Sequence, residues 1–183
     1  FFLNGEFNLD SSPSSYYVGY EGCRISESDA IAIANRYKEL TGYDGGGYGR
    51  QNLQSRASSL IARLDWNISK RHTLSLRYNF LDAAKDEFSS NASLLRFNGE
   101  GYTSISDTHS VVAELNSRIS QRTFNEFRIG YTRVHDGRDA MSGEKLPYVN
   151  IVKMRDGENT SVYIGTDPFA IMNDLVQNTV TLT

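Results

Sequence analysis

Apolar and polar residues alternate along two stretches of the chain, and the first stretch begins near Ser59. Its apolar positions lie on both sides of a polar turn at 69–71; they are Leu60, Ala62, Leu64, Trp66 and Ile68, then Leu74, Leu76, Tyr78 and Phe80. Because successive side chains of a strand point to opposite faces, this pattern predicts two strands, each with one apolar and one polar face. The tight turn that joins them predicts a β-hairpin.

The second stretch repeats this arrangement around a polar turn at 120–122. Its apolar positions are Val111, Ala113, Leu115 and Ile119, then Phe127, Ile129 and Tyr131. Ala113 corresponds to Ala62 of the first stretch, and Arg128 corresponds to Arg77. The chain is therefore predicted to use one hairpin design twice.

The lengths of these strands and of their connections favour a membrane environment. Each predicted strand has about ten residues, near the ~9–11 with which a tilted strand crosses a bilayer, whereas soluble strands more often have about five or six. The turns at 69–71 and 120–122 are tight, and the segments 82–108 and 135 onward are long. Short turns on one side and long loops on the other are typical of outer-membrane barrels. We therefore expect an all-β fold, an antiparallel transmembrane β-barrel segment with long extracellular loops and about six to eight strands.

Charged residues fall on the polar side of the predicted strands. They are Arg63, Asp65, Arg77, Glu114, Arg118, Glu126 and Arg128. In a wide barrel this side lines a watery lumen, where opposite charges pair across strands. In a soluble, secreted β-sandwich or adhesion module the same residues face solvent, so the charges leave both architectures open.

One segment is predicted to form a short helix within a long loop. Ser26 and Asp29 suit a helix start, and Gly42 suits its end. An apolar stripe at helical spacing lies between them and comprises Ala30, Ile33, Ala34, Tyr37 and Leu40. We expect this stripe to pack on the loop or on the barrel rim.

The two ends of the chain give weaker patterns. An opening strand is predicted over 1–9, and short strands over 149–154 and 162–164 flank a turn at Asp156-Gly157. The segment 168–176 is predicted to be irregular or a helical turn, followed by the start of a strand over 178–183. Because the chain begins with Phe1 rather than Met, we interpret residues 1–183 as one partial barrel domain of a longer protein.

Composition and motifs exclude several functions. The net charge is -3 and basic residues are scattered, which argues against nucleic acid as a partner. The single Cys23 excludes a disulfide framework and a cysteine-based zinc site. No run approaches the roughly 20 apolar residues of a membrane helix. We find no strained Gly-x-Ser-x-Gly turn, so we expect no catalytic residue and no enzyme activity.

Metal and cofactor sites are also not expected. His72, His109 and His135 fit no metal-binding spacing, and we interpret them as three unconnected surface histidines. The acidic pairs Asp86-Glu87 and Asp156 with Glu158 lack the ligand spacing of a calcium loop.

Two longer phrases resemble a known family. ARLDWNISKRHTLSLRYNF (62–80) and AELNSRISQRTFNEFRIGYTRV (113–134) resemble barrel hairpins of TonB-dependent transporters, in the Oar-like branch common in Bacteroidetes. The opening FFLNGEF and the tail IGTDPFAIMNDLVQNTVTLT are similar to barrel strands and a loop of that branch.

The resemblance implies a barrel of roughly 22 strands around an N-terminal plug, in the outer membrane of a Gram-negative bacterium. It implies energised uptake of a nutrient, although some Oar-like members look more like adhesion or secretion proteins, which leaves a structural barrel in a surface assembly open. The implied partners are membrane lipid or lipopolysaccharide, the TonB complex through the plug, and a surface lipoprotein or other outer-membrane partner.

Five tyrosines in the predicted loops are our candidates for contact with a ligand or partner. They are Tyr16, Tyr17, Tyr20, Tyr43 and Tyr48. Amphipathic rings suit recognition surfaces, and they suit packing at a barrel rim equally well.

Overall fold

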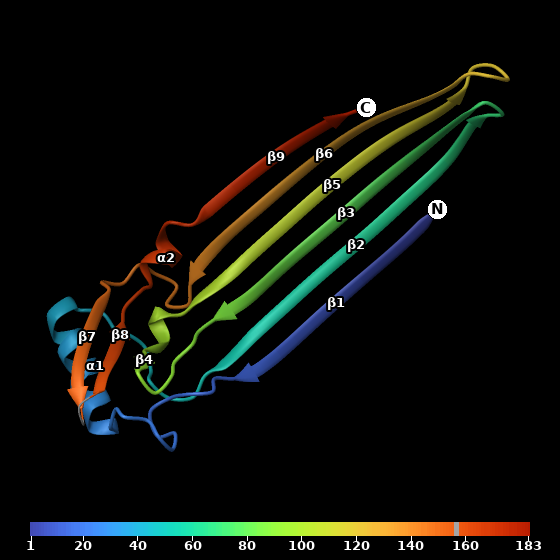
Figure 1. Ribbon diagram of the computed structural model, residues 1–183. Coiled ribbons are helices and arrows are strands. Elements are labelled where there is room, and N and C mark those ends of the chain that lie inside the picture. Colours follow the sequence, from blue (N-terminus) through green and yellow to red (C-terminus); the bar gives the residue numbers. More distant parts are fainter. Residues whose placement is uncertain (156–157) are drawn as a thin grey trace.

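Six antiparallel strands form one long sheet, the largest part of the molecule (Figure 1). The computed structural model describes residues 1–155 and 158–183. The strands of this sheet are β1 (Phe2–Pro13), β2 (Asn52–Ser69), β3 (His72–Glu87), β5 (Tyr102–Arg118), β6 (Phe124–Ala140) and β9 (Asp174–Leu182). Each pairs with the next in the order β1-β2-β3-β5-β6-β9, so the predicted antiparallel sheet and both predicted hairpins are confirmed.

The connections at the two ends of the sheet are unequal, as predicted. Two residues join β2 to β3 and five join β5 to β6. The backbone N–H of Arg118 donates to the carbonyl of Arg71 over 2.8 Å and ties these two turns together. The connections at the other end, over 14–51, 88–101 and 141–173, are long.

The long strands extend beyond the lengths that alternation predicts. β2, β3, β5 and β6 have 16 to 18 residues each, rather than about ten. Alternation of apolar residues ends near Phe80, but pairing of β3 with β5 continues as far as Glu87 and Tyr102. The prediction that 82–108 is all loop is therefore wrong at both ends, because ladder hydrogen bonds form between backbones whether the side chains are apolar or polar.

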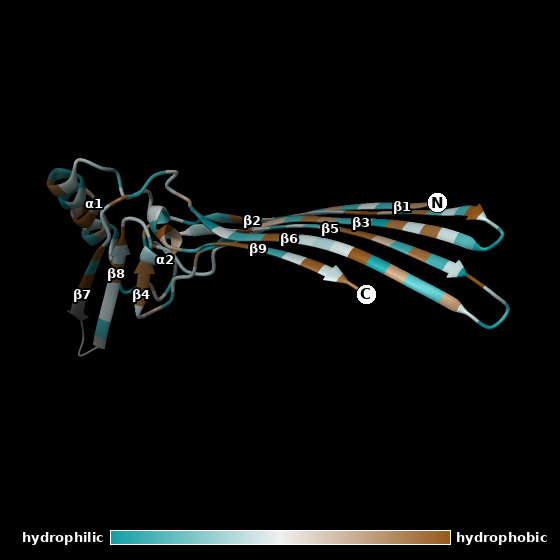
Figure 2. Cartoon of the chain, turned by 90° about the horizontal axis from the view of Figure 1, so that it is seen from above, coloured by the Kyte–Doolittle hydropathy of each residue, from teal (hydrophilic) through white to brown (hydrophobic). Residues whose placement is uncertain are grey.

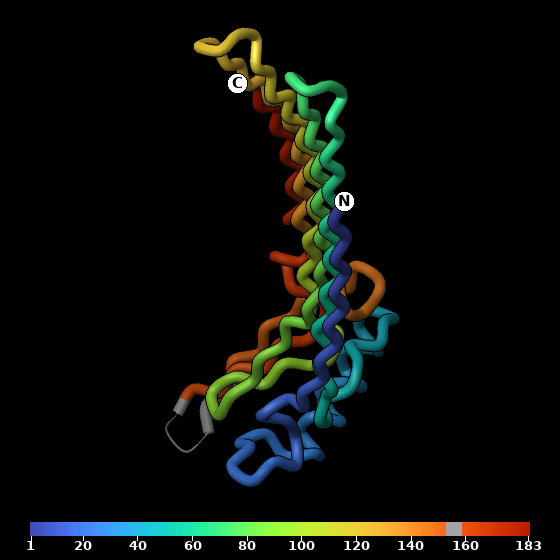
Figure 3. Tube along the Cα trace, turned by 90° about the vertical axis from the view of Figure 1, so that its right-hand side faces the viewer, coloured from blue at the N-terminus to red at the C-terminus, as the bar shows by residue number. Residues whose placement is uncertain are grey.

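The long connections fold together into a small unit at one end of the sheet, which we call the cap (Figure 3). Its elements are α1 (Glu27–Thr41), β4 (Leu94–Arg96), the 3-10 turn η1 (Asn98–Glu100), β7 (Val149–Arg155), β8 (Glu158–Ile164) and α2 (Pro168–Ile171). β8 lies between β4, which is parallel to it, and β7, which is antiparallel.

Helix α1 forms where the sequence predicts it. Ser26 caps its start: Oγ accepts from the backbone N–H of Asp29 over 3.2 Å, and the Asp29 carboxylate accepts in return from the Ser26 backbone. Gly42 ends it with a φ of 79°, a left-handed conformation that favours glycine. Ala30 and Tyr37 are buried in the cap, which confirms the predicted packing of the stripe, while Leu40 is exposed.

The remaining expectations are met in part. β7 and β8 occur close to the predicted strands. The segment predicted to be irregular or a helical turn contains α2, and β9 begins at Asp174 rather than at 178. The predicted turn at Asp156-Gly157 lies outside the described residues.

The apolar core lies in the cap and not in the large sheet. Its buried cluster comprises Tyr16, Val18, Ile25, Ala30, Tyr37, Leu95, Phe97, Val162 and Ile164. None of these residues belongs to the six long strands. Trp66 of β2, in contrast, is 58% exposed. A sandwich covers such a face with a second sheet, and within the described residues the large sheet has no such cover.

Candidate functional site

One face of the large sheet carries a continuous band of apolar side chains. Register places Leu64, Leu76, Ala113, Ile129 and Leu182 in one row across five strands. The apolar band comprises Leu3, Phe7, Leu9, Leu60, Ala62, Leu64, Trp66, Leu74, Leu76, Tyr78, Phe80, Val111, Ala113, Leu115, Phe127, Ile129, Tyr131, Val180 and Leu182. Figure 2 shows the resulting alternation of apolar and polar positions along the strands.

The height of the apolar band fits a bilayer. About ten positions of a strand, at ~3.3 Å each and a tilt of about 40°, span ~25 Å, which is the apolar height of an outer-membrane barrel. Leaving a large apolar side chain in water forgoes roughly 1.5–3 kcal/mol compared with burying it. A face with so many of them is therefore stable only when apolar groups cover it, and the height of the band matches the hydrocarbon of a bilayer.

The same face becomes charged toward the cap. This charged rim comprises Asp82, Asp107, His109, Arg133, His135 and Asp174. It starts at the row of His109 and Arg133, which also contains Phe80, the register partner of His109. On β3, β5, β6 and β9 the strand segments beyond this row therefore lie outside the hydrocarbon layer, whereas on β1 the apolar side chains of Phe7 and Leu9 continue past it.

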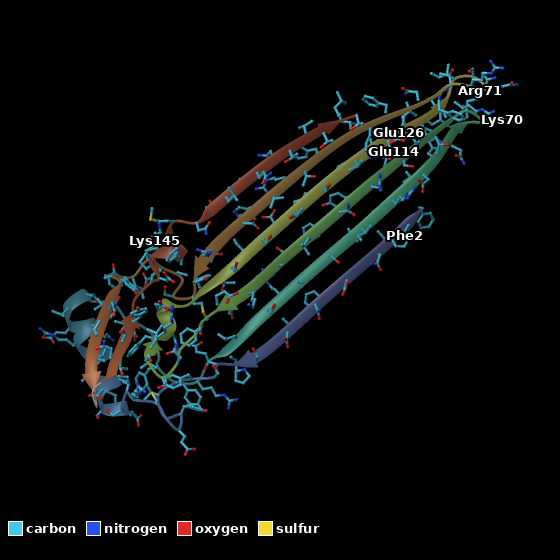
Figure 4. All side chains as sticks on the ribbon, in the orientation of Figure 1. Phe2, Lys70, Arg71, Glu114, Glu126 and Lys145 are labelled. Carbon is cyan, nitrogen blue, oxygen red and sulfur yellow. The ribbon has the colours of Figure 1, made fainter. Side chains whose placement is uncertain are left out.

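The opposite face carries a network of charges, as predicted. Glu114 lies at its centre and accepts hydrogen bonds from Arg77 over 3.2 Å, Arg128 over 3.0 Å and Asn116 over 2.8 Å. Figure 4 shows Glu114 and Glu126 in the half of the sheet that carries the turns. A second carboxylate, that of Asp65, accepts from Arg63 over 3.0 Å and from Ser75 over 2.6 Å.

The ion pairs of Glu114 join β3, β5 and β6, and the hydrogen bond from Ser75 to Asp65 adds β2, on a face that water reaches. Arg77 and Arg128 are each 41% exposed at their side chains. Glu114 itself is 16% exposed. Pairs with half-exposed arginines contribute roughly 0–1 kcal/mol each, so the network does not by itself hold the sheet together. It makes the face wettable, as the lumen of a wide barrel requires.

The five candidate tyrosines differ in their surroundings. Tyr16 is buried, donating its hydroxyl to the Gly22 carbonyl and accepting from the Arg24 N–H, both over 3.2 Å. The Tyr20 ring, which is more exposed, lies 5.8 Å from that of Tyr16 and 6.0 Å from that of Tyr17. These three rings therefore form a cluster in one loop.

Tyr48 and Tyr43 lie elsewhere in the cap. The Tyr48 ring packs edge-on against Phe97, with 5.7 Å between ring centroids, and so borders the cap core. Tyr43 is exposed, just after the end of α1. Contact of these tyrosines with a ligand remains a prediction, with Tyr17, Tyr20 and Tyr43 the better placed for it.

Sequence reasoning missed an aromatic contact on the polar face near the cap. Arg138 and Tyr102 share that face, and the guanidinium lies 5.1 Å from the Tyr102 ring centroid and 5.9 Å from that of Phe169 in α2. Helix α2 therefore lies over the end of the polar face. Asp167 caps this helix and Pro168 follows it, a pair that signals a helix start in sequence.

A cavity of about 370 Å³ adjoins α2 and is lined by Pro168, Phe169, Met172 and Asn173. A second cavity, of about 340 Å³, lies where the cap meets the strands. Its polar lining includes Asp44, Gln51, Asn98 and Glu144. The Asn98 Oδ1 atom is buried without a hydrogen-bond partner in the described structure.

The cap contains a buried ion pair that the sequence did not indicate. Glu100 in η1 is 2% exposed, and both its carboxylate oxygens lie 2.8 Å from Nη1 of Arg96. The same guanidinium lies 5.4 Å from the ring centroid of Tyr163. Burial raises the pKa of Glu100 to about 7, against the opposing effect of Arg96.

The prediction of three unconnected histidines is wrong for two of them, because His109 and His135 both approach the carboxylate of Asp107. The two ring nitrogens of His135 lie 2.8 Å and 2.7 Å from carboxylate oxygens of Asp107 and Asp174. His109 is hydrogen-bonded to the Tyr78 hydroxyl and His72 to that of Ser117. The three lie on paired strands, and only the register of the sheet reveals their partners.

Within the described residues, no three side chains of His, Cys, Asp or Glu are grouped so that they could hold a metal ion. Asp86 accepts from Thr103 and from the backbone of Gln54, and Glu87 pairs with Lys85. These contacts give the acidic pair a structural role. The side chains of Asp156 and Glu158 lie outside the described residues.

The fold and the two faces define a membrane β-barrel wall, and comparison with known families agrees. A model of an outer membrane beta barrel domain matches residues 20–180, so the chain belongs to this family. It lies in the bacterial outer membrane and forms part of a barrel wall. No curated protein and no solved structure matches the chain. No helix among the described residues is long and apolar enough to cross a membrane.

Proposed function

We propose that this chain is part of the barrel of a TonB-dependent transporter of the Oar-like type, found in Bacteroidetes, and that its cap meets a nutrient before energised uptake. The phrases that resemble this family fall on β2–β3 and β5–β6, the two hairpins with the most regular apolar band. The resemblance therefore concerns the elements that build the wall.

The observation that carries the proposal is the contrast between the two faces of one sheet. An apolar band faces lipid, and the opposite face holds ion pairs in which half-exposed arginines surround Glu114. In a narrow barrel side chains fill the interior, whereas half-exposed charges suit a wide lumen that admits water or a plug.

The cap supplies surfaces for ligand contact. The polar cavity offers carboxylate and amide groups, those of Asp44, Glu144 and Gln51, to a ligand with hydroxyl or amide donors. Tyr17, Tyr20 and Tyr43 offer rings on the surface of the same unit. We infer a polar nutrient or its carrier, with no reaction catalysed by this chain.

The proposed partners follow from these surfaces. The apolar band and charged rim meet membrane lipid or lipopolysaccharide. Coupling to the TonB complex runs through a plug domain, and the cap is a surface for a lipoprotein or another outer-membrane partner.

A second candidate is a structural barrel in a surface or secretion assembly, which uses the same wall without energised uptake. The exposed apolar band argues against the third candidate, a soluble sandwich.

The test uses the full-length protein in its native membrane. We expect it in the outer-membrane fraction, with a mobility on gels that changes on boiling. We also expect binding or growth on the ligand to depend on an intact TonB system. A boiling-sensitive barrel whose loss leaves TonB-dependent growth on all tested nutrients unchanged favours the structural assembly. A soluble protein without a boiling shift overturns the barrel in full.

A further inference from the structure

His135 occupies a special place in the charged rim, because it lies between carboxylates from both neighbouring strands. On β6, its Nδ1 lies 2.8 Å from Asp107 of β5 and its Nε2 lies 2.7 Å from Asp174 of β9. The His135 side chain is 25% exposed. One imidazole ring therefore links three strands.

This geometry requires a particular protonation state. A neutral imidazole has one N–H and one acceptor nitrogen, and an ionised carboxylate only accepts. Two short contacts to two carboxylates are both hydrogen bonds only if both ring nitrogens carry protons. His135 is therefore an imidazolium in this arrangement.

The charges around His135 come from four strands. On β6 itself, Arg133 donates to Asp107 over 3.0 Å, and on β5 His109 lies 3.9 Å from the same carboxylate. On β3, Asp82 is the register partner of Asp107. On β9, Asp174 faces His135. Asp107 keeps the positive charge of Arg133 if His135 becomes neutral, whereas Asp174 loses the cation that faces it.

The link to Asp174 is placed where the chain leaves the cap. Asp174 is the first residue of β9, and its pairing with Gly137 is the last of the ladder between β6 and β9. The nine residues before it, 165–173, include α2, whose Phe169 contacts Arg138 on the polar face. Holding Asp174 in place therefore fixes the end of the segment that carries α2.

We propose that His135 is a pH-sensitive clasp. As an imidazolium it ties the start of β9 to β5 and β6 and so keeps α2 over the mouth of the lumen. Deprotonation of His135 frees the α2 segment. The inference rests on the proposed function in one respect, that the polar face lines a lumen. The clasp is closed at low pH, where the His135 ring is protonated, and it opens as pH rises and the ring loses a proton. Because two carboxylates favour the charged ring, opening is centred above the ~6.5 of a free histidine.

The experiment follows the mobility of α2 in the full-length protein in lipid nanodiscs. Met172 is the C-cap residue directly after α2 and is 87% exposed, so a spin label at Met172→Cys in a Cys23→Ser background reports on this segment. Between pH 5.5 and 9 we expect the label spectrum to change from constrained to mobile. In His135→Gln and in Asp174→Asn the label is expected to be mobile at every pH.

Two controls separate the clasp from other titrating groups. His72 is also a strand histidine, bonded to Ser117 at the turn end, and His72→Gln is expected to leave the transition unchanged. Glu100→Gln removes the buried acid of the cap and is expected to leave it unchanged as well.

Persistence of the pH transition in His135→Gln and Asp174→Asn overturns the clasp, as does a wild-type spectrum that is constant over this pH range. Neither result bears on the barrel, because the boiling shift and the TonB-dependent uptake are measured independently. Conversely, if the pH transition is observed in a protein that shows no TonB-dependent uptake, the clasp is supported and only the proposed transport function is overturned.

Discussion

Glu114 and Arg128 face each other directly across β5 and β6, with 2.9 Å between carboxylate and guanidinium. Because Glu114 also accepts from Arg77 of β3, it joins three strands on the polar face. Glu114→Gln keeps the shape of the side chain and leaves both arginines without their central anion. We expect a loss of about 1 kcal/mol or less, since the pairs are half-exposed.

Urea unfolding of the detergent- or lipid-refolded barrel, followed by the boiling shift on gels, measures this loss. Glu126→Gln is the matched control, because Glu126 contacts only the outer side of the network through Arg128. A loss of several kcal/mol for Glu114→Gln contradicts a wetted face and indicates a dry interior around this carboxylate.

Leu64 and Ile61 test the assignment of the two faces. Both lie on β2, with 50% and 42% exposed side chains, but on opposite sides of the sheet. We expect Leu64→Arg to destabilise the barrel by ~2–4 kcal/mol, the depth-dependent effect of a charge on the lipid side, and Ile61→Arg by under ~1 kcal/mol. Folding efficiency into lipid vesicles measures both.

The same pair separates the barrel from a soluble sheet. If neither face meets lipid, two similarly exposed apolar residues respond alike to arginine. Equal effects at Leu64 and Ile61 therefore contradict the membrane assignment.

The wall of the barrel was predictable from sequence because its signal is local. Alternation at Leu74, Leu76 and Tyr78 determines which face is apolar, and the tight turn beside it determines the pairing. The outer ends of the strands were not predictable in this way. At Asp82 the lipid-facing position turns polar where the strand leaves the hydrocarbon, so the pattern stops while the backbone ladder continues.

The contacts of the site depend on register and on the folding of distant loops, which sequence reasoning does not supply. Asp107, His135 and Asp174 are far apart in the chain and meet through the pairing of β5, β6 and β9. Tyr16 was a reasonable candidate for an exposed ring, yet it is buried because the cap has an apolar core of its own. Glu100 in a polar segment gave no sign of its burial for the same reason.

Gly165 is expected to be essential to the packing of the cap. Its φ is 102°, and a Cβ there would overlap the carbonyl oxygen of Pro147. Gly165→Ala therefore combines backbone strain with a steric clash, and we expect it to destabilise the cap by about 2–4 kcal/mol. Limited proteolysis of the folded barrel, read as cleavage within 141–173, measures the loss.

Gly143 is the matched control for this substitution. It has a φ of 74°, and a Cβ there meets nothing within 4 Å. Gly143→Ala is expected to cost only the backbone strain, about 1 kcal/mol. Equal protease sensitivity of the two variants contradicts the clash at Gly165.

Glu100 gives the cap a stability that depends on pH. Its pKa is raised from 4.5 to about 7 in the folded cap, so the folded state binds more protons than the unfolded state between these values. The cap is therefore most stable below pH ~4.5 with respect to this group and loses up to about 3 kcal/mol as pH rises through ~7. Glu100→Gln removes the titrating group and is expected to flatten this dependence.

Protease sensitivity of the cap at pH 5 and pH 8, corrected for protease activity on an unfolded substrate, measures this pH dependence. A cap equally resistant at both pH values in the wild type shows that Arg96 offsets the burial of the carboxylate in full.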